Sequence, residues 1–575
     1  MLNLLKLLIL VSFSFSFSAF GMCEGIHVHS KEKIEFTDTE VNLVCGDPKS
    51  NSYKEVPHYQ AQFYFVGFLQ SRGYLNSTFE DKDGVLHVNA GKISHLKKVH
   101  ADSPIDSEAT AVKKNTRKLF KKKILTPKLL NDIETESLSV LRQRGYPCSS
   151  VKSEANSLDD TVTVIIPKLK FERFGDIDKE AISGLRDNAL DRYYPFHAED
   201  PFNEKLLKLT EKRMLRSEVV SGTYFLDNCM NQHQDFKLRQ EFIVGPPRSF
   251  RYGFGASTEL GPMVRVQWAH NRSGSMASIL KASFMASLRS QTLSLSSDNF
   301  LWKNHSRRSL LSSFNVSRQS QIKFDETVVN FKPHMKFTSD NYTHQWIRTI
   351  GPTVESGTYK SRDSDTKSYK TISLEGSIQR MAHDYEIYDV NPEEGNSLGM
   401  SFDYRDPNLG FSDRLLKLDT NYVSLTHLTD WGRGWLVGGF RVNMGTTWVS
   451  REVDIKALPP SVKYYGGGSD DIRGFLLNTI PKNDGLGALT KISTKFELRR
   501  TYLFYKSVEG FTFLDNAYFG DYSWSIVPRL WYSPGLGIRW ISPIGLLQTY
   551  VSRAYATNPH QDLGNFYYVG FGGVF

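Results

Sequence analysis

The sequence predicts an α+β array of three small domains followed by an all-β transmembrane barrel of about 16 strands. Three observations support this architecture. Beyond the N-terminus, no stretch reaches the roughly 20 apolar residues that a membrane-spanning helix needs, although aromatic residues make up 13% of the chain and glycine numbers 42. The first half carries a repeated pattern of helices and strands. The second half consists of short segments in which apolar and polar residues alternate.

The N-terminus has the features of a secretory signal. Lys6 supplies positive charge, residues 7–20 are apolar apart from serines, and Ala19-Phe20-Gly21 provides small residues for cleavage. We therefore predict a signal peptide over residues 1–21. Cys23 follows closely, but the residues before it form a poor lipidation motif. The apolar stretch is also too short for a membrane anchor.

A weak repeat with a period of about 75 residues organises the region before the barrel. In two copies a helical segment ends in glycine followed by tyrosine, at Gly73 and Gly145, and strands follow. In the third copy, Gly222 follows a helical pattern over residues 202–220. Glycine at a helix C-terminus readily adopts the left-handed conformation that ends a helix. The predicted domains are residues 22–94, 95–167 and 168–247.

The barrel is predicted to occupy residues 248–575. Gly245-Pro246-Pro247 interrupts the repeat and marks the boundary. Beyond it, segments such as residues 264–268 alternate apolar and polar side chains. The remaining length accommodates about 16 strands, an even number as in bacterial single-chain barrels. The alternative is a soluble β-sandwich pair or a propeller; the signal peptide, the tyrosine-rich strand ends and the terminal Phe575 favour the barrel.

Charge and cysteine content restrict the expected partners. The formal net charge is +9, and a basic run occupies residues 121–123. Such a run usually lies on a solvated helix face, but it can also attract anionic lipid headgroups or acidic partners. Nucleic acid is not an expected partner of a secreted chain. Four cysteines could pair in an oxidising compartment, in any of three connectivities, or remain free. They are Cys23, Cys45, Cys148 and Cys229.

No pattern predicts an enzyme, a metal site or a cofactor. His27 and His29 share a strand face, but a metal site needs more ligands. The segment that ends at Gly84 resembles a calcium loop without its closing glutamate, so a hairpin turn is the better interpretation. The glycines at 466–468 lack the Lys-Ser/Thr ending of a phosphate loop. No Gly-x-Ser-x-Gly nucleophile elbow occurs in a strand-turn-helix context.

The most specific motif is GGGSDDIRGF at residues 466–475. It resembles the Arg-Gly-aromatic motif of the long sixth extracellular loop in outer-membrane assembly factors and two-partner secretion transporters. The resemblance implies that this loop folds back into the barrel and that Arg473 meets acidic residues on the twelfth and thirteenth strands. Glu497 and Asp515 occupy those positions. The predicted site is therefore Ile472, Arg473, Gly474, Phe475, Glu497 and Asp515.

The three N-terminal repeats resemble POTRA domains, whose order is strand, two helices, two strands. Three such domains before a barrel are similar to the TamA family, the outer-membrane subunits of translocation and assembly modules. The resemblance implies a TamB-type, inner-membrane-anchored partner, unfolded outer-membrane clients such as autotransporters, contact with outer-membrane lipids, and POTRA domains in the periplasm. One departure is Gln548 in the penultimate strand, where that family often has an acidic residue.

Glycines in the first and last barrel strands predict a weak lateral seam, because glycine contributes little to a strand. The predicted seam residues are Gly253, Gly255, Gly570, Gly572 and Phe575. The predicted function is insertion of client proteins through this seam, where a client strand pairs with the opened edge. Two alternatives remain: an exporter that passes an unfolded passenger through its lumen, and a passive porin or receptor.

Overall fold

The computed structural model describes residues 18–572 except residues 24, 48, 50–55, 121–122, 230–235, 302–306, 342, 362–364, 383–392, 451–454, 482–485 and 544. The predicted signal peptide therefore lies largely outside the described residues. The chain forms two compact units. The first comprises Met1–Asp178, Phe196–Lys205 and Leu226–Arg239, and the second comprises Lys179–Pro195, Leu206–Phe225 and Gln240–Phe575.

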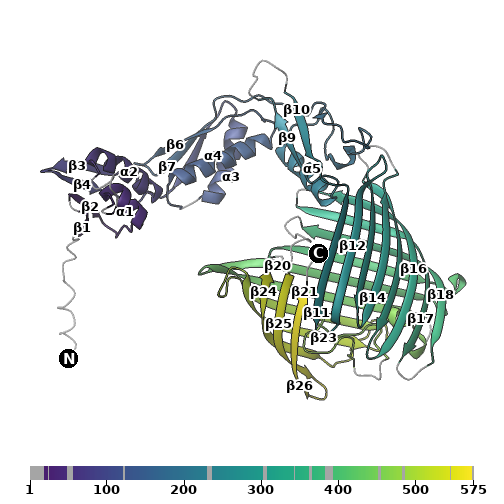
Figure 1. The fold of residues 1–575 in the computed structure, drawn as a ribbon. Coiled ribbons are helices and arrows are strands. Elements are labelled where there is room, and N and C mark those ends of the chain that lie inside the picture. The colour runs from purple at the N-terminus through teal and green to yellow at the C-terminus, as the bar shows by residue number, and fades with distance from the viewer. Residues whose placement is uncertain are drawn as a thin grey trace, which may run out of the picture. The chain divides into compact units, whose positions relative to one another are not determined.

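The first domain is a four-stranded sheet with two helices (Figure 1). Its strand order is β1-β2-β4-β3, with β2 parallel to β4 and β3 antiparallel to β4. The buried faces of the strands and of the second helix share one core, in which Phe65, Leu69 and Leu86 are fully buried. The elements are β1 (Ser18–Cys23), β2 (Ile26–Ser30), α1 (Asp38–Cys45), α2 (His58–Ser71), β3 (Thr78–Lys82) and β4 (Val85–Asn89).

Helix α1 begins at a capping box that also holds the start of the domain in place. The Thr37 side chain accepts a hydrogen bond from the Glu40 backbone N–H, and the Glu40 carboxylate accepts one from the Thr37 backbone N–H. Such reciprocal bonds satisfy backbone donors that a helix start leaves unpaired. Arg72, just after α2, also donates to Glu40 at 2.7 Å. This hydrogen bond lowers the pKa of Glu40 to about 2.

The second domain repeats the order strand, two helices, two strands. Its sheet order is β5-β7-β6, with β5 parallel to β7 and β6 antiparallel to β7. Helix α4 begins after the cap Thr126, with proline in its first turn, where a missing backbone N–H costs nothing. The elements are β5 (Lys98–Asp102), α3 (Asp106–Phe120), α4 (Pro127–Arg142), β6 (Lys152–Asn156) and β7 (Thr161–Ile165).

The third domain departs from this order. Among its described residues there is one α-helix, and a short 3-10 helix precedes it. The helix ends at Arg216, earlier than the predicted residue 220, and Gly222 begins the next strand. The elements are β8 (Asp178–Lys179), η1 (Asp191–Tyr193), α5 (Glu204–Arg216), β9 (Gly222–Asp227) and β10 (Leu238–Ile243), with sheet order β8-β10-β9.

All four cysteines are paired. One disulfide joins Cys23 to Cys45, and the other joins Cys148 to Cys229. Their sequence separations are 22 and 81 residues. A cross-link that closes a longer loop removes more entropy from the unfolded chain. The longer bridge is therefore expected to stabilise the N-terminal domains more than the shorter one.

Removing the longer disulfide should destabilise these domains strongly. For Cys148→Ser with Cys229→Ser, the expected loss in the free energy of unfolding is about 4 kcal/mol. Calorimetry of the full chain measures it as a lower melting temperature of the N-terminal transition. The matched control is Cys23→Ser with Cys45→Ser, for which a smaller loss is expected. An equal or larger loss in the control would contradict the loop-length argument.

The C-terminal part is a closed barrel of sixteen antiparallel strands, each paired with its neighbour in sequence (Figure 1). This confirms the predicted fold class and strand number. The strands are β11 (Arg248–Ser257), β12 (Gly261–Ser273), β13 (Ser278–Ser287), β14 (Ser290–Asn299), β15 (Arg308–Ser320), β16 (Phe324–Asp340), β17 (His344–Ser361), β18 (Lys367–Ala382), β19 (Gly395–Arg405), β20 (Leu415–Trp431), β21 (Gly434–Val449), β22 (Thr490–Arg500), β23 (Val508–Gly520), β24 (Trp531–Ser542), β25 (Gly545–Ala556) and β26 (Gln561–Gly572).

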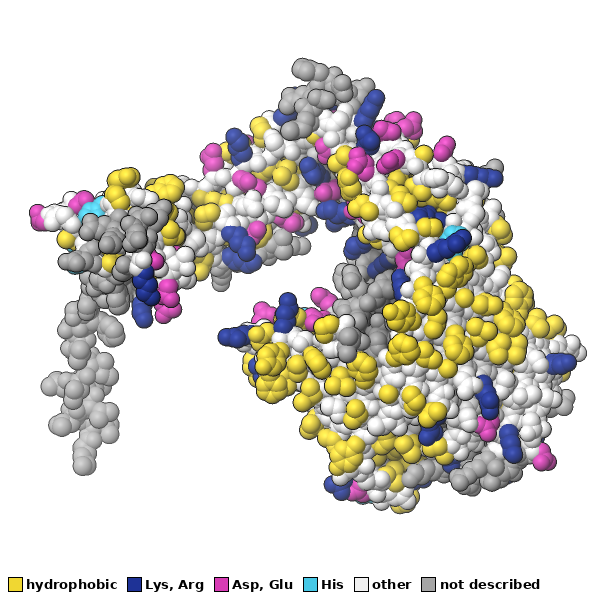
Figure 2. Space-filling view, viewed as in Figure 1, with side chains coloured by type: hydrophobic (Ala, Val, Ile, Leu, Met, Phe, Trp, Pro, Cys, Tyr) yellow, Lys and Arg dark blue, Asp and Glu magenta, His cyan; other side chains and the backbone are white. Residues whose placement is uncertain are grey.

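The barrel wall alternates apolar side chains outward and polar side chains inward, as expected of a barrel surrounded by lipid. Figure 2 shows hydrophobic side chains gathered over its outer surface. Phe250, Tyr252 and Phe254 on β11 are each more than 60% exposed. Inside the barrel, the Asn315 side chain on β15 donates to the Asn330 side chain on the neighbouring strand β16, at 2.9 Å. Among the described residues, no helix is both long and apolar enough to cross a membrane.

The two ends of the barrel differ. We call the end where β11 begins the proximal end, and the opposite end, where β11 turns into β12, the distal end. At the proximal end Arg213 of α5 donates to Asp340 at 2.9 Å, and Arg307 donates to the same carboxylate at 2.7 Å. Asp340 is almost fully buried. This ion pair fixes α5 to the proximal end of the barrel.

Candidate functional site: the lumen loop and the barrel seam

The segment between β21 and β22, residues 450–489, turns back into the barrel from the distal end; we call it the lumen loop. Its short helices are η3 (Ile455–Ala457) and η4 (Pro460–Val462). Ile472 is fully buried and Phe475 is 5% exposed. Both belong to one apolar cluster with inward-facing residues of the wall, including Phe519 and Trp531. The loop therefore has a core of its own against strands β23 to β25.

Arg473 is held by two carboxylates. Its Nε and Nη2 donate to the two oxygens of Asp515, both at 2.8 Å, and its Nη1 donates to Glu497 at 2.5 Å. The Arg473 backbone N–H also donates to Asp515, at 2.9 Å. The guanidinium lies 3.6 Å from the ring centre of Phe513. Arg473 is 2% exposed and Asp515 is 0% exposed. The structure thus brings together the three charged residues that the motif predicts.

Glu497 also forms ion pairs with two arginines of the barrel wall. Its second oxygen lies 3.3 Å from Arg499 Nε and 3.4 Å from Arg539 Nη2. Arg539 in turn donates to the side-chain oxygen of Gln548 at 3.1 Å. An amide oxygen accepts this bond without adding charge. Gln548, where an acidic residue is usual in the family of resemblance, therefore still takes part in the network.

Gly474 lies where no other residue fits without rearrangement. Its φ is +96°, a conformation that costs side-chain-bearing residues energy. A Cβ at this position would lie 2.2 Å from the Ser533 hydroxyl and 3.0 Å from the Ser552 hydroxyl. The glycine therefore lets the loop approach β24 and β25 closely enough for Arg473 to reach both carboxylates.

Gly474→Ala should release the loop tip. The clash with the wall is expected to displace Arg473, so a protease should cut the loop of the folded barrel much faster. The control is Gly432→Ala, because Gly432 also has positive φ, +65°, but its Cβ would have no atom closer than 4.0 Å. Backbone strain alone should cost about 1 kcal/mol. Equal protease sensitivity in both variants would contradict the role of the close approach.

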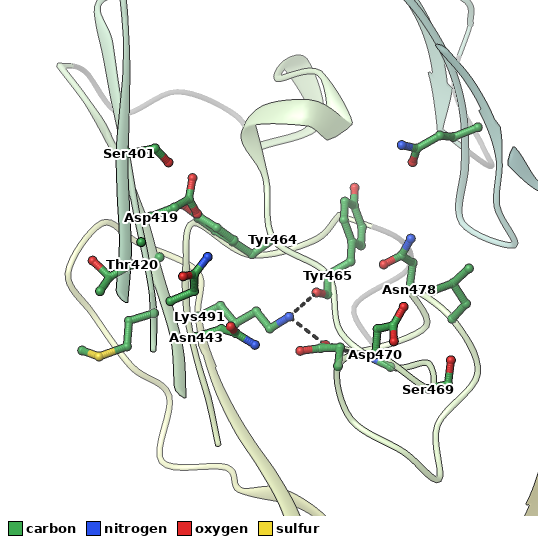
Figure 3. Close-up of a pocket in the computed structure, with 18 of the residues that line it drawn as sticks. Ser401, Asp419, Thr420, Asn443, Tyr464, Tyr465, Ser469, Asp470, Asn478 and Lys491 are labelled. Carbon is green, nitrogen blue, oxygen red and sulfur yellow. Dashed lines mark hydrogen bonds and ion pairs between the residues drawn. The ribbon is translucent and has the colours of Figure 1, made fainter. Parts of the chain in front are cut away.

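A second anchor on the same loop was missed in the sequence. Asp471 accepts hydrogen bonds from Lys491 at 2.7 Å and from Ser493 at 3.1 Å. Lys491 also donates to the Tyr465 backbone oxygen at 2.9 Å, as Figure 3 shows, and Lys495 donates to the Ser469 backbone oxygen at 3.0 Å. The available signal was the alternation of residues 491, 493, 495 and 497 on one strand, which places all four side chains on the lumen face.

The distal half of the lumen encloses a polar cavity beside this anchor. Its volume is about 720 Å³, and the wall side chains around it include Asp419 and Asn443 (Figure 3). The loop contributes Tyr464, Asp470 and others. A lining of amides, hydroxyls and carboxylates suits water and polar chain segments rather than lipid.

The seam between the first and last strands is short as far as the described residues reach. There β11 pairs with β26 at three positions, Gly255 with Gly572, Ala256 with Phe571 and Ser257 with Gly570. By contrast, β11 pairs with β12 at ten positions and β26 with β25 at eleven. One backbone bond, from Thr258 N–H to Val569, adds to the seam at 3.0 Å. Within the described residues, the seam edge of β11 from Arg248 to Phe254 has no β26 partner.

This pairing can be compared with the predicted seam residues only as far as Gly572. Gly255, Gly570 and Gly572 lie in the seam, but Gly253 pairs with Arg265 of β12 and has no described partner on β26. The register that pairs Gly255 with Gly572 leaves no described residue of β26 opposite Gly253. Phe575 lies outside the described residues.

The lumen loop also reaches the seam strand. Glu259, in the turn between β11 and β12, accepts hydrogen bonds from the Ser469 backbone N–H at 3.1 Å and from its hydroxyl at 2.8 Å. Glu259 is 8% exposed. Gly468, next to it, has φ +100°, and a Cβ there would lie 2.2 Å from Glu259. The same loop thus contacts the wall at β22–β25 and the hairpin on the other side of the seam.

Three neighbouring histidines of the first domain are a weaker candidate for a functional site. His29 Nε2 lies 3.1 Å from Nδ1 of His87, and the His27 ring lies edge-on to His87. Across the part of the chain that the structure describes, no three His, Cys, Asp or Glu residues lie together as metal ligands would.

Comparison with known families shows which family the chain belongs to. Residues 277–573 match the Omp85 superfamily domain, which is more than half of the sequence. The chain belongs to the Omp85 superfamily. This Omp85 assignment agrees with the resemblance of the loop motif, and it makes the barrel an outer-membrane barrel of the Omp85 type.

Two solved structures share the fold. BamA from Haemophilus ducreyi lacking POTRA domains 1 to 3 aligns with a TM-score of 0.56 at 15% identity, covering 84% of this chain and 100% of that one. CdiB from Escherichia coli aligns with a TM-score of 0.51 at 11% identity, covering 90% and 97%. Both alignments extend beyond the barrel into the N-terminal domains, which resemble POTRA domains. At these identities the likeness concerns the Omp85 fold alone.

Proposed function

We propose that this Omp85 protein inserts client proteins, autotransporters among them, into the outer membrane through its lateral seam. The observation that carries the proposal is the seam itself. Among the described residues, three paired positions close it, whereas the neighbouring ladders have ten and eleven. A strand edge with free backbone groups is a template for another strand. A client strand can add to β11 by β-augmentation.

The side chains of the free edge support this role. Phe250, Tyr252 and Phe254 alternate along β11 and point outward. A client strand that pairs there would continue an apolar outer face, as a nascent barrel requires in lipid. The opened edge would also satisfy the backbone of the client while it enters the membrane.

We further propose that the chain acts in the manner of the TamA family, with a TamB-type partner in the periplasm. Two sheets of the strand, helix, helix, strand, strand type and a third sheet precede the barrel, which is the domain number expected for that family. Edge strands of these sheets offer further sites for strand addition. A pull-down from envelope extracts with the N-terminal domains tests the partner; recovery of a general assembly subunit instead would contradict it.

Insertion and export make opposite demands on the protein, so one reconstitution separates them. Purified protein in liposomes should speed the folding of a urea-unfolded client barrel into the same membrane, and its conductance should stay low because the lumen loop occupies the barrel. An exporter of an unfolded passenger should instead conduct when the passenger is present and leave client folding unchanged. A porin should conduct without either. The last two results would reject the proposal.

A further inference from the structure

A second cavity lies at the proximal end of the lumen, far along the barrel from the lumen loop. Its volume is about 520 Å³. Helices η1 and α5 contribute to its lining together with the inward faces of β13 to β18. Seven of the described side chains that line it are lysine or arginine, and Asp298 is the one acidic side chain among them.

Two described carboxylates form ion pairs with three of these cations. Arg213 and Arg307 share Asp340, and Lys336 pairs with Asp298 at 2.5 Å. Arg216 has an interaction partner of its own. The other six cations exceed these two carboxylates by four formal charges. Of these six, Arg192, Lys212 and Lys281 form no ion pair with a described carboxylate.

Arg192 is the most deeply buried of these cations. It is 3% exposed, and its Nε and Nη2 donate to the backbone oxygens of Ala189 and Met276. Its Nη1 has no hydrogen-bond partner in the described part of the chain, and no carboxylate there forms an ion pair with it. The guanidinium lies 3.8 Å from the ring centre of Phe300. A buried guanidinium nitrogen without a hydrogen-bond partner is unfavourable, so Arg192 could bind an anion through Nη1.

The same cavity also has an apolar side, which is unusual for the inner face of a barrel. Ile279 and Leu311 both pair with Asp298 across the ladder and so share its inward face. Ile347 and Met381 lie on the inner faces of β17 and β18, and Leu215 of α5 is 44% exposed. Positive charge and apolar surface therefore line one space.

We propose that this cavity binds an acidic segment of an unfolded polypeptide, with carboxylates on the cations and apolar side chains on the inner wall. The inference rests on the proposed function and names the chemistry of the client segment. A peptide fits better than an anionic lipid because the cavity opens on the lumen. A lipid would have to withdraw its acyl chains from the bilayer to reach it.

Binding of defined peptides to the detergent-solubilised full chain tests the proposal. The probes are a short peptide of alternating aspartate and phenylalanine, the same peptide with lysine for aspartate, and one with serine for phenylalanine. We expect salt-sensitive binding of the first alone. Lys212→Glu should weaken it by roughly tenfold or more, because the substitution reverses one charge at the site. Lys212 is exposed on α5, so this change should leave folding intact.

The matched control is Lys208→Glu, one turn earlier on the exposed face of α5 and outside the cavity lining. It makes the same change in net charge and should leave binding nearly unchanged. Arg192→Gln, checked for folding by heat-dependent gel mobility, should weaken binding like Lys212→Glu. Equal effects of Lys208→Glu and Lys212→Glu would overturn the proposal. So would binding of phosphatidylglycerol vesicles without binding of the acidic peptide. The assay contains no insertion step, so its failure is distinct from failure of the proposed function.

Discussion

Arg473→Ala is expected to destabilise the folded barrel by about 3–5 kcal/mol, the range for removing one partner of a buried ion pair. The reason is Asp515, which is fully buried and would lose three of its hydrogen-bond donors, two from the guanidinium and one from the displaced backbone. Glu497 would keep Arg499 and Arg539. Unfolding in urea, followed by the gel mobility of the folded barrel, measures the loss.

The control for this variant is Arg441→Ala. Arg441 also lies on the lumen face, but it reaches the Asp470 backbone oxygen at 3.5 Å and pairs with no carboxylate in the described residues. It should lose little stability. Adding Asp515→Asn to Arg473→Ala should recover part of the loss, because the stranded charge is gone. If Arg473→Ala and Arg441→Ala unfold alike, the ion pair is not what holds the loop.

A disulfide across the seam is expected to abolish client insertion while leaving the barrel folded. Ala256→Cys and Phe571→Cys are directly opposed on β11 and β26. Closing the seam covalently prevents a client strand from reaching the β11 edge. The measurement is client folding into liposomes with and without a reductant. Since the four native cysteines are already paired, the new bridge has no native thiol to compete with it.

The matched control shares one of these cysteines. Leu547→Cys with Phe571→Cys bridges β25 and β26, which already pair along their whole length. It should leave insertion unchanged under oxidising conditions. If the seam bridge is as harmless as this control, clients do not enter through the seam. Loss in both variants would point to a general effect of oxidation instead.

Much of this architecture was readable from the sequence, and the reasons are local. Alternation along strands with turn residues between them is a property of each segment alone, so the sixteen strands could be predicted. The Arg473 motif carried its own backbone requirement in Gly474 and its own charge in Arg473. Its resemblance to the loop motif of outer-membrane assembly factors implied that Glu497 and Asp515 are the partners of Arg473.

Features that depend on register could not be predicted in the same way. The register of the seam, which pairs Gly255 with Gly572, follows from neither strand alone. Stagger follows from closure of the whole barrel and not from any one strand. The contact of Glu259 with Ser469 joins residues 210 positions apart, and no short pattern announces it. The surplus of cations at the proximal end likewise arises from six strands and two helices that meet only in the folded chain.

The contact between Glu259 and Ser469 links two motions thermodynamically. The loop that carries Ser469 is bound to the wall at β22–β25, and Glu259 belongs to the hairpin that begins with β11. β11 therefore cannot separate from β26 unless those two hydrogen bonds break or the loop moves with the hairpin. Opening the edge and undocking the loop tip are coupled equilibria, and a change that stabilises one state of the loop must shift the population of the other.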